Sequence, residues 1–187
     1  MPRLLAASVA LVITLNLVAA PVPKDVPKEQ PLYFPTKVGT KWVYAHGDED
    51  QTEVITAAEY KTKERLWVVQ VTTSNKEKRV TEWEVSDQGL FWVMDRGKER
   101  ATQCWLKLPH KAGEKWDLVP EYRFRCVTLE SQKIKVPAGE FDAIGVEIYL
   151  GDTLFVTRWY APGVGLVKLA DEKSTRSVLK SFTPGKD

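Results

Sequence analysis

The sequence has few of the residues that most often carry out chemistry. Among its 187 residues are only two histidines, two cysteines and two methionines. The histidines, His46 and His110, stand in separate polar stretches without the spacing of zinc ligands. No GxSxG, P-loop or GxGxxG pattern occurs. We therefore expect no catalytic residues, no cofactor and no metal site.

An excess of charge of one sign is also missing. The formal net charge is only +2, and basic and acidic residues are interspersed along the chain. A nucleic-acid-binding protein usually carries a clustered basic patch. We therefore expect no nucleic-acid partner.

The first twenty residues have the layout of a secretory signal peptide. Arg3 gives a basic start, Leu4–Val18 is almost wholly apolar, and Ala19 and Ala20 supply the small residues of a cleavage site. Because Pro21 would hinder cleavage directly before it, cleavage after Ala19 and cleavage after Ala20 both stay open. An uncleaved anchor is the alternative reading of this segment. We expect an exported protein, periplasmic or secreted, with no stable membrane span after signal removal.

Composition then divides the chain into three parts. Prolines recur from Pro21 to Pro35, interleaved with charged residues, which predicts an extended linker. The predicted boundaries are a signal peptide at 1–20, a Pro-rich linker at 21–32 and a single β domain at 33–187, a normal length for one domain.

Apolar residues recur with a period of two along most of this domain. Ile144, Val146 and Ile148, for example, alternate with Gly145 and Glu147, as in a half-buried strand. Only residues 56–65 suggest a helix, and it would be short. The pattern predicts an all-β fold, an antiparallel meander of about ten to twelve strands in a curved sheet, half-barrel or barrel.

Residues typical of turns separate the predicted strands. Gly can adopt the positive φ that tight hairpins need, and Pro fixes the first corner of a turn. In Ala161–Val164, Pro stands second and Gly third, as in a type II turn. The residues assigned to structural turns are Pro137, Gly139, Gly151, Pro162, Gly163 and Gly165.

One eight-residue frame, PxKxGxKW, occurs twice. The copies contain Gly39 and Trp42 at residues 35–42, and Gly113 and Trp116 at residues 109–116. Two equivalent corners of a repeated sheet would explain the frame, each Trp opening a strand and filling the core. One good turn-then-strand sequence arising twice would explain it equally well.

Cys104 and Cys126 are an even number of cysteines in a chain predicted to be exported, which favours one disulfide. Cys104 shares its predicted strand face with Leu106, and Cys126 shares its face with Phe124. Both thiols should therefore point to the apolar side of the sheet. The alternative is two unpaired, buried thiols.

Aromatic residues are plentiful, with seven Trp, six Tyr and six Phe. Most should fill the core, but aromatic side chains also line binding sites. Trp105 lies between Gln103 and Lys107 on the face opposite Cys104, and Trp92 lies in a run that is apolar on both faces. Trp105 and Trp92 are the candidates for lining a cavity.

Four segments carry a resemblance to a known group of proteins. Tyr33–Tyr44, Leu108–Trp116, Val136–Phe141 (VPAGEF) and Trp159–Lys168 (WYAPGVGLVK) resemble the motifs of an uncharacterised family of exported bacterial β-rich domains. The resemblance spans Tyr33–Phe182. It implies an antiparallel, half-barrel sheet, loosely similar to periplasmic lipoprotein carriers, and it implies no activity.

Together these features indicate a non-enzymatic envelope or secreted β domain that binds an apolar or lipid-like ligand. The first alternative is a structural or interaction module with a filled core and no ligand, and the second is an enzyme of unknown class. The expected partner is an apolar small molecule or an envelope protein. A cavity in the sheet would favour ligand binding, and a solid core would favour the structural module.

Overall fold

A computed structural model describes residues 31–74, 78–96, 99–119 and 122–186. The predicted signal peptide and residues 21–30 of the predicted linker lie outside the described residues. Over the described ranges there is no helix of the length and apolarity that crossing a membrane requires.

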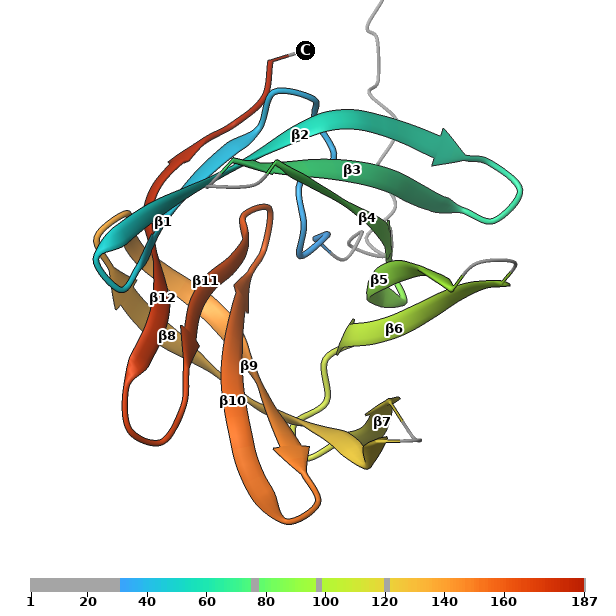
Figure 1. Cartoon of the computed structure of the whole chain (residues 1–187). Helices are drawn as coiled ribbons and strands as arrows, with labels where there is room; N and C mark the ends of the chain where they lie inside the picture. Colours follow the sequence, from blue (N-terminus) through green and yellow to red (C-terminus); the bar gives the residue numbers. More distant parts are fainter. Residues whose placement is uncertain (1–30, 75–77, 97–98, 120–121, 187) are drawn as a thin grey trace, which may run out of the picture.

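The described chain is all-β, and the predicted fold class is confirmed. Twelve strands form one antiparallel sheet that rolls into a nearly closed, barrel-like shape (Figure 1). The strands are β1 (Lys41–His46), β2 (Glu49–Lys61), β3 (Leu66–Ser74), β4 (Arg79–Ser86), β5 (Gly89–Arg96), β6 (Glu99–Lys107), β7 (Lys115–Val119), β8 (Phe124–Val136), β9 (Gly139–Leu150), β10 (Thr153–Ala161), β11 (Gly165–Ala170) and β12 (Thr175–Thr183).

The short helix predicted at residues 56–65 is wrong. Strand β2 continues through this segment to Lys61 and pairs with β3. The pairing register shifts between Ile55 and Ala57, which marks a β-bulge. Because the bulge changes which residues face the core, it hides the period-two pattern of a strand.

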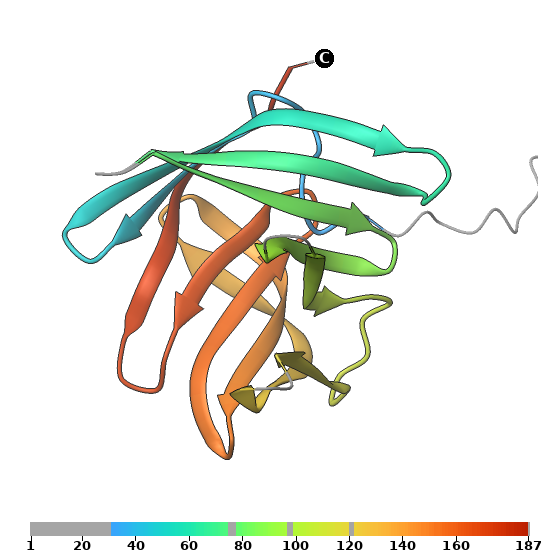
Figure 2. The ribbon, with the colours of Figure 1, turned by 45° about the vertical axis from the view of Figure 1, so that its right-hand side comes forward.

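The sheet consists of two six-stranded meanders placed end to end. Its strand order is β6-β5-β4-β3-β2-β1-β12-β11-β10-β9-β8-β7, so β1–β6 and β7–β12 each pair only with sequence neighbours except where β1 meets β12. We call the β1·β12 pair the closed seam. The edge strands β6 and β7, which have no ladder between them, form the open seam. The second view of the ribbon, in Figure 2, shows β6 and β7 close together at this gap.

Each meander begins at one copy of the PxKxGxKW frame, and the two corners have the same local structure. The N–H of Gly39 donates to the carbonyl of Ile55 at 2.9 Å, and the N–H of Ile55 donates back to the residue after the glycine at 2.9 Å. Gly113 and Thr128 repeat both bonds at 2.7 and 3.0 Å. The glycines have φ of +82° and +78°, a left-handed conformation that suits Gly. The two copies of the frame therefore have the same backbone hydrogen bonds and the same glycine conformation.

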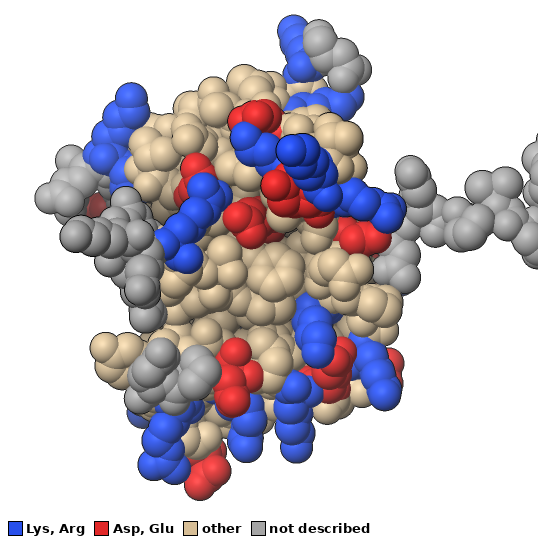
Figure 3. All heavy atoms as spheres, turned by 90° about the vertical axis from the view of Figure 1, so that its right-hand side faces the viewer, with Lys and Arg blue, Asp and Glu red and all other residues tan. Residues whose placement is uncertain are grey.

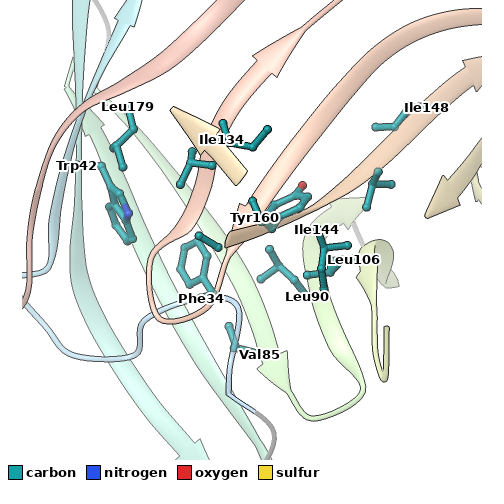
Figure 4. Close-up of a cluster of buried hydrophobic side chains, with 14 of the residues drawn as sticks. Phe34, Trp42, Val85, Leu90, Leu106, Ile134, Ile144, Ile148, Tyr160 and Leu179 are labelled. Carbon is teal, nitrogen blue, oxygen red and sulfur yellow. The ribbon is translucent and has the colours of Figure 1, made fainter. Parts of the chain in front are cut away.

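Phe34, directly before the first corner, and Trp42 at its end pack in the interior of the rolled sheet. Phe34 packs on Trp42 and Trp83, with ring centroids 5.3 and 5.8 Å apart. A Cβ on Gly165 would lie 3.2 Å from the ring of Phe34, so glycine leaves room for this close packing. Figure 4 shows Phe34 and Trp42 among side chains that converge on the interior from strands of both meanders.

Two side-chain hydrogen bonds tie β1 to the second meander. The indole N–H of Trp42 donates to the carbonyl of Val164 at 2.7 Å, and the hydroxyl of Tyr44 donates to the carbonyl of Leu166 at 2.9 Å. Both side chains are buried, so the bonds satisfy donors that have little access to water.

The predicted turn residues lie between strands or begin one. Gly151 (φ +61°) stands between β9 and β10, Pro137 stands between β8 and β9, and Gly139 and Gly165 are the first residues of β9 and β11. Gly163 has φ of +68°, and the N–H of Val164 donates to the carbonyl of Ala161 at 3.2 Å, the bond that closes a four-residue turn.

Candidate functional site

Two adjoining cavities lie among the inward-facing side chains of the sheet, with volumes of about 430 and 280 Å³. Trp105, Arg158 and Leu169 line both of them. Known small-molecule sites are roughly 300–1,000 Å³, and most are apolar with a few polar groups. The pair therefore has the size of a ligand site.

The first cavity combines aromatic and polar walls. Phe34 and Tyr160 are among its aromatic residues, and both point to the interior in Figure 4. Besides Arg158 of β10, the polar lining comes from β1, β2, β3, β4 and β12 and consists of His46, Gln51, Glu53, Thr73, Arg79, Thr81 and Ser177.

The second cavity lies at the open seam and is mostly apolar. Gln103 and Trp105 of β6 line it on one side, and Leu118 and Val119 of β7 line it on the other. Its remaining apolar lining consists of Phe124, Ile148, Phe155, Val156 and Leu169. Two arginines complete it: Arg158, and Arg176, whose Nε is paired with a carboxylate oxygen of Asp171 at 2.8 Å. Figure 3 shows an uncharged band between two zones of charged side chains on the side of the molecule where β5, β6 and β7 lie.

Phe155 stands between this cavity and solvent. It lines the second cavity, yet 43% of it is exposed, and its ring meets Phe124 edge-on with centroids 5.7 Å apart. Tyr122 and Leu150, at the neighbouring strand ends, are also large exposed apolar residues. Phe155 is therefore the exposed mouth of the second cavity, and the guanidinium carbon of Arg176 lies 5.2 Å from its ring centroid.

Arg158 is the charged residue at the junction of the cavities. It follows Val156 and precedes Tyr160 on the inward face of β10, and its guanidinium carbon lies 3.9 Å from the ring centroid of Trp105. Its Nη1 reaches the hydroxyl of Tyr160 at 3.5 Å, which is a long hydrogen bond. Its Nε is buried and has no hydrogen-bond partner among the described residues.

Burial also shifts the pKa values of acids in this interior. Desolvation raises the pKa of Glu53, and the opposing effects of Gln51 and Arg158 are smaller. Desolvation likewise raises the pKa of Tyr44 and of Tyr160. Burial in this interior therefore favours the uncharged forms of these three acids.

The two tryptophans proposed as cavity-lining residues both lie at this site. Trp92 lines the first cavity, and Trp105 lines both, with their ring centroids 6.3 Å apart. The indole N–H of Trp105 is buried and has no partner among the described residues. The repeated-corner residues and the structural turns lie outside both linings.

The predicted disulfide is absent, because Cys104 and Cys126 are free thiols. A disulfide would need the strands of the two cysteines, β6 and β8, to lie close together, but β7 pairs with β8 on the side nearest β6. Trp116 of β7 is opposite Cys126 in register, and its indole N–H donates to the carbonyl of Cys104 at 2.7 Å. Burial, the main cause, raises the pKa of Cys104 to about 11 and that of Cys126 to about 12.

Other polar groups have structural partners instead. Glu82 and Glu84 both contact Arg100, at 2.6 and 3.3 Å. His110 shares a hydrogen bond with the carbonyl of Leu129 at 2.7 Å. Within the described ranges, no three His, Cys, Asp or Glu residues are grouped as metal ligands.

Sequence reasoning missed Arg158 and Glu53. A signal for Arg158 was present, because it breaks an otherwise apolar inward face between Val156 and Tyr160. Glu53 gives no such signal, since it lies in a polar stretch and becomes buried only when the sheet rolls up.

Comparison with known proteins identifies the fold. No protein-family model matches the chain, and no curated protein matches it. The chain is similar to the crystal structure of a predicted lipoprotein from Parabacteroides distasonis, with 15% identity, a TM-score of 0.52, and coverage of 82% of this chain and 99% of that one. It is also similar to a predicted exported protein with a YmcC-like fold from Bacteroides fragilis, with 14% identity, a TM-score of 0.50, and coverage of 82% and 100%. At these identities the likeness concerns the fold.

Proposed function

We propose that this chain is an exported, non-enzymatic protein that binds an apolar or lipid-like ligand inside its rolled sheet. The observation that carries the proposal is the second cavity, whose apolar lining joins both edges of the open seam and continues into the exposed mouth at Phe155. Exposed aromatic residues around an apolar cavity are typical of ligand sites.

Export is supported by the signal-like residues 1–20 and by the predicted lipoprotein and exported protein that share the fold. In this proposal residues 21–32 are a linker and 33–187 form one domain. The exported form should begin at Ala20 or Pro21. N-terminal sequencing checks this, and a chain that keeps Met1 in the membrane fraction would contradict it.

Native mass spectrometry of protein purified from its own host is the direct test of ligand binding. A bound apolar molecule that is released on unfolding is the expected result. As a second measurement, the protein should bind the fluorescent probe N-phenyl-1-naphthylamine in a saturable way.

Two variants locate that binding. Val156 is 4% exposed and lines the second cavity, so Val156→Phe should fill the cavity and weaken probe binding at least tenfold. Val80 is 57% exposed and lines neither cavity, so Val80→Phe makes the same chemical change without an expected effect. No saturable binding and no co-purified molecule would favour the structural module with a filled core.

A further inference from the structure

The junction between the cavities holds two buried donors that lack acceptors. They are the Nε of Arg158 and the indole N–H of Trp105, and the guanidinium carbon lies 3.9 Å from the Trp105 ring centroid. A buried donor without an acceptor is costly, more so on a charged group. Both side chains line the two cavities, so an oxygen-bearing ligand at the junction would bring an acceptor beside them.

The charge at this junction favours an acidic ligand. A carboxyl group closely paired with Arg would have a lowered pKa, whereas burial dominates at Glu53 and raises its pKa. The carboxylate of Glu53 accepts from the side-chain amide of Gln51 at 2.7 Å, whereas the guanidinium of Arg158 makes the long hydrogen bond to the hydroxyl of Tyr160. A carboxylate or phosphate beside Arg158 would pair with the guanidinium and accept from the Nε.

The two cavities that adjoin at Arg158 have different linings, and this difference determines the orientation of the ligand. The first cavity contains Glu53 and other polar groups, and the second is lined mainly by apolar side chains such as Leu118 and Phe155. An apolar body therefore fits the second cavity, with its far end toward the exposed mouth. Its acidic group then lies at Arg158, where the two cavities adjoin.

We propose that the ligand is an acidic amphipath, with one carboxylate or phosphate held by Arg158 and Trp105 and an apolar body in the second cavity. This inference rests on the proposed function and adds the chemical class of the ligand. Arg158 and Trp105 are the residues that determine specificity for the acidic group.

Three twelve-carbon probes test the inference by isothermal titration calorimetry: dodecanoate, dodecyl phosphate and the uncharged dodecanol. The wild-type chain should bind at least one of the two acids tenfold or more tightly than dodecanol. The acid that binds more tightly identifies the natural headgroup as carboxylate or phosphate.

Variants assign that preference to its residues. Arg158→Met should abolish the preference for acid while leaving dodecanol affinity within about twofold. Trp105→Phe removes one donor and keeps the ring, so it should weaken acid binding by a few-fold and leave dodecanol unchanged. If Arg158→Met does not fold, Arg158→Lys keeps the charge, removes the Nε donor and should give an intermediate preference.

Arg125 offers a matched control. Like Arg158 it stacks on an aromatic ring, 5.6 Å from the centroid of Tyr149, and has an unpartnered Nε, but it lines neither cavity. Arg125→Met should therefore leave the preference for acid unchanged. Equal binding of acids and dodecanol by the wild-type chain would overturn this inference and leave the proposed function standing. Failure of all three probes to bind would overturn both.

Discussion

At the closed seam, β1 and β12 pair from Lys41 to Ala45. Trp42 and Leu179 behind this pair are at most 1% exposed, while Tyr44 and Ser177 of the same strands line the first cavity. At the open seam, β6 and β7 have no ladder, Trp116 is only partly buried, and a cavity lies behind the strands. Both seams join the last strand of one meander to the first strand of the other. The two corners have the same local structure, yet β1 after the first corner pairs with its neighbour across the seam and β7 after the second corner does not.

Strand spacing explains the difference. A backbone ladder holds neighbouring strands about 4.8 Å apart, which brings their inward side chains into contact. The open seam is spanned instead by the bond from Trp116 to the carbonyl of Cys104, a side chain reaching to a backbone. Without a ladder the inward side chains need not meet, and space for a ligand remains.

The largest expected effect comes from comparing the two corner tryptophans. Trp42→Ala removes a buried ring and leaves the carbonyl of Val164 without its donor, so the free energy of unfolding should fall by about 3–5 kcal/mol. Trp116→Ala removes a partly buried ring and should cost about 1–2 kcal/mol. Urea unfolding of both variants measures this, and equal losses would contradict the comparison.

The two corner glycines, in contrast to the two tryptophans, should lose the same free energy of unfolding when they are substituted. Gly39 and Gly113 share a positive φ, and an added Cβ would meet nothing within 4 Å at either site. Backbone strain is then the only cost of Gly39→Ala and Gly113→Ala, about 1–2 kcal/mol each in thermal or urea unfolding. If the two losses of unfolding free energy differed by more than the expected backbone strain, the two corners would not be equivalent.

Thiol labelling sharpens the comparison at the open seam. With pKa values of about 11 and 12, Cys104 and Cys126 should be almost entirely protonated at pH 8, with roughly a thousandth or less as thiolate. Raising the pH toward 11 should increase the reactive fraction of Cys104 first. Ellman's reagent should therefore label neither thiol quickly in the folded protein.

Two controls complete this measurement. Both thiols should react in urea without reductant, whereas a protein with no reactive thiol there would contain the disulfide that the structure lacks. Trp116→Ala should speed labelling of Cys104 in the folded state, because Trp116 spans the seam beside it.

The smallest effects should come from surface ion pairs beside each seam. Lys180 contacts Asp50 at 2.7 Å near the closed seam, and Lys107 contacts Glu114 at 2.6 Å near the open seam. Both pairs lie at the surface, so double-mutant cycles should show little or no coupling in either pair, and less at high salt. A larger coupling at the open seam would mean that charge, rather than Trp116, holds it.

The sequence was sufficient for features that depend on neighbours along the chain. Alternation in segments such as Ile144–Leu150 predicted the all-β meander. It failed at β2, where the bulge after Ile55 shifts the alternation. Such a shift depends on the partner strand β3, which local periodicity does not describe.

Features that depend on distant strands could not be predicted in the same way. Glu53 and Arg158 meet in one cavity only because the closed seam brings β2 and β10 around the same interior. The disulfide prediction failed for a related reason. The sequence pattern placed both thiols on the apolar side of the sheet, and this suggested a bridge. Which strands are adjacent depends instead on the position of β7 beside β8.

Amide hydrogen exchange tests most directly the claim that one seam is closed and the other open. Amides of β1 and β12 that face each other should exchange only on global unfolding. Amides of β6 and β7 that face the open seam should exchange faster, by roughly a hundredfold or more. Equal protection at the two seams would contradict this account, because it would mean that β6 and β7 are joined by backbone hydrogen bonds.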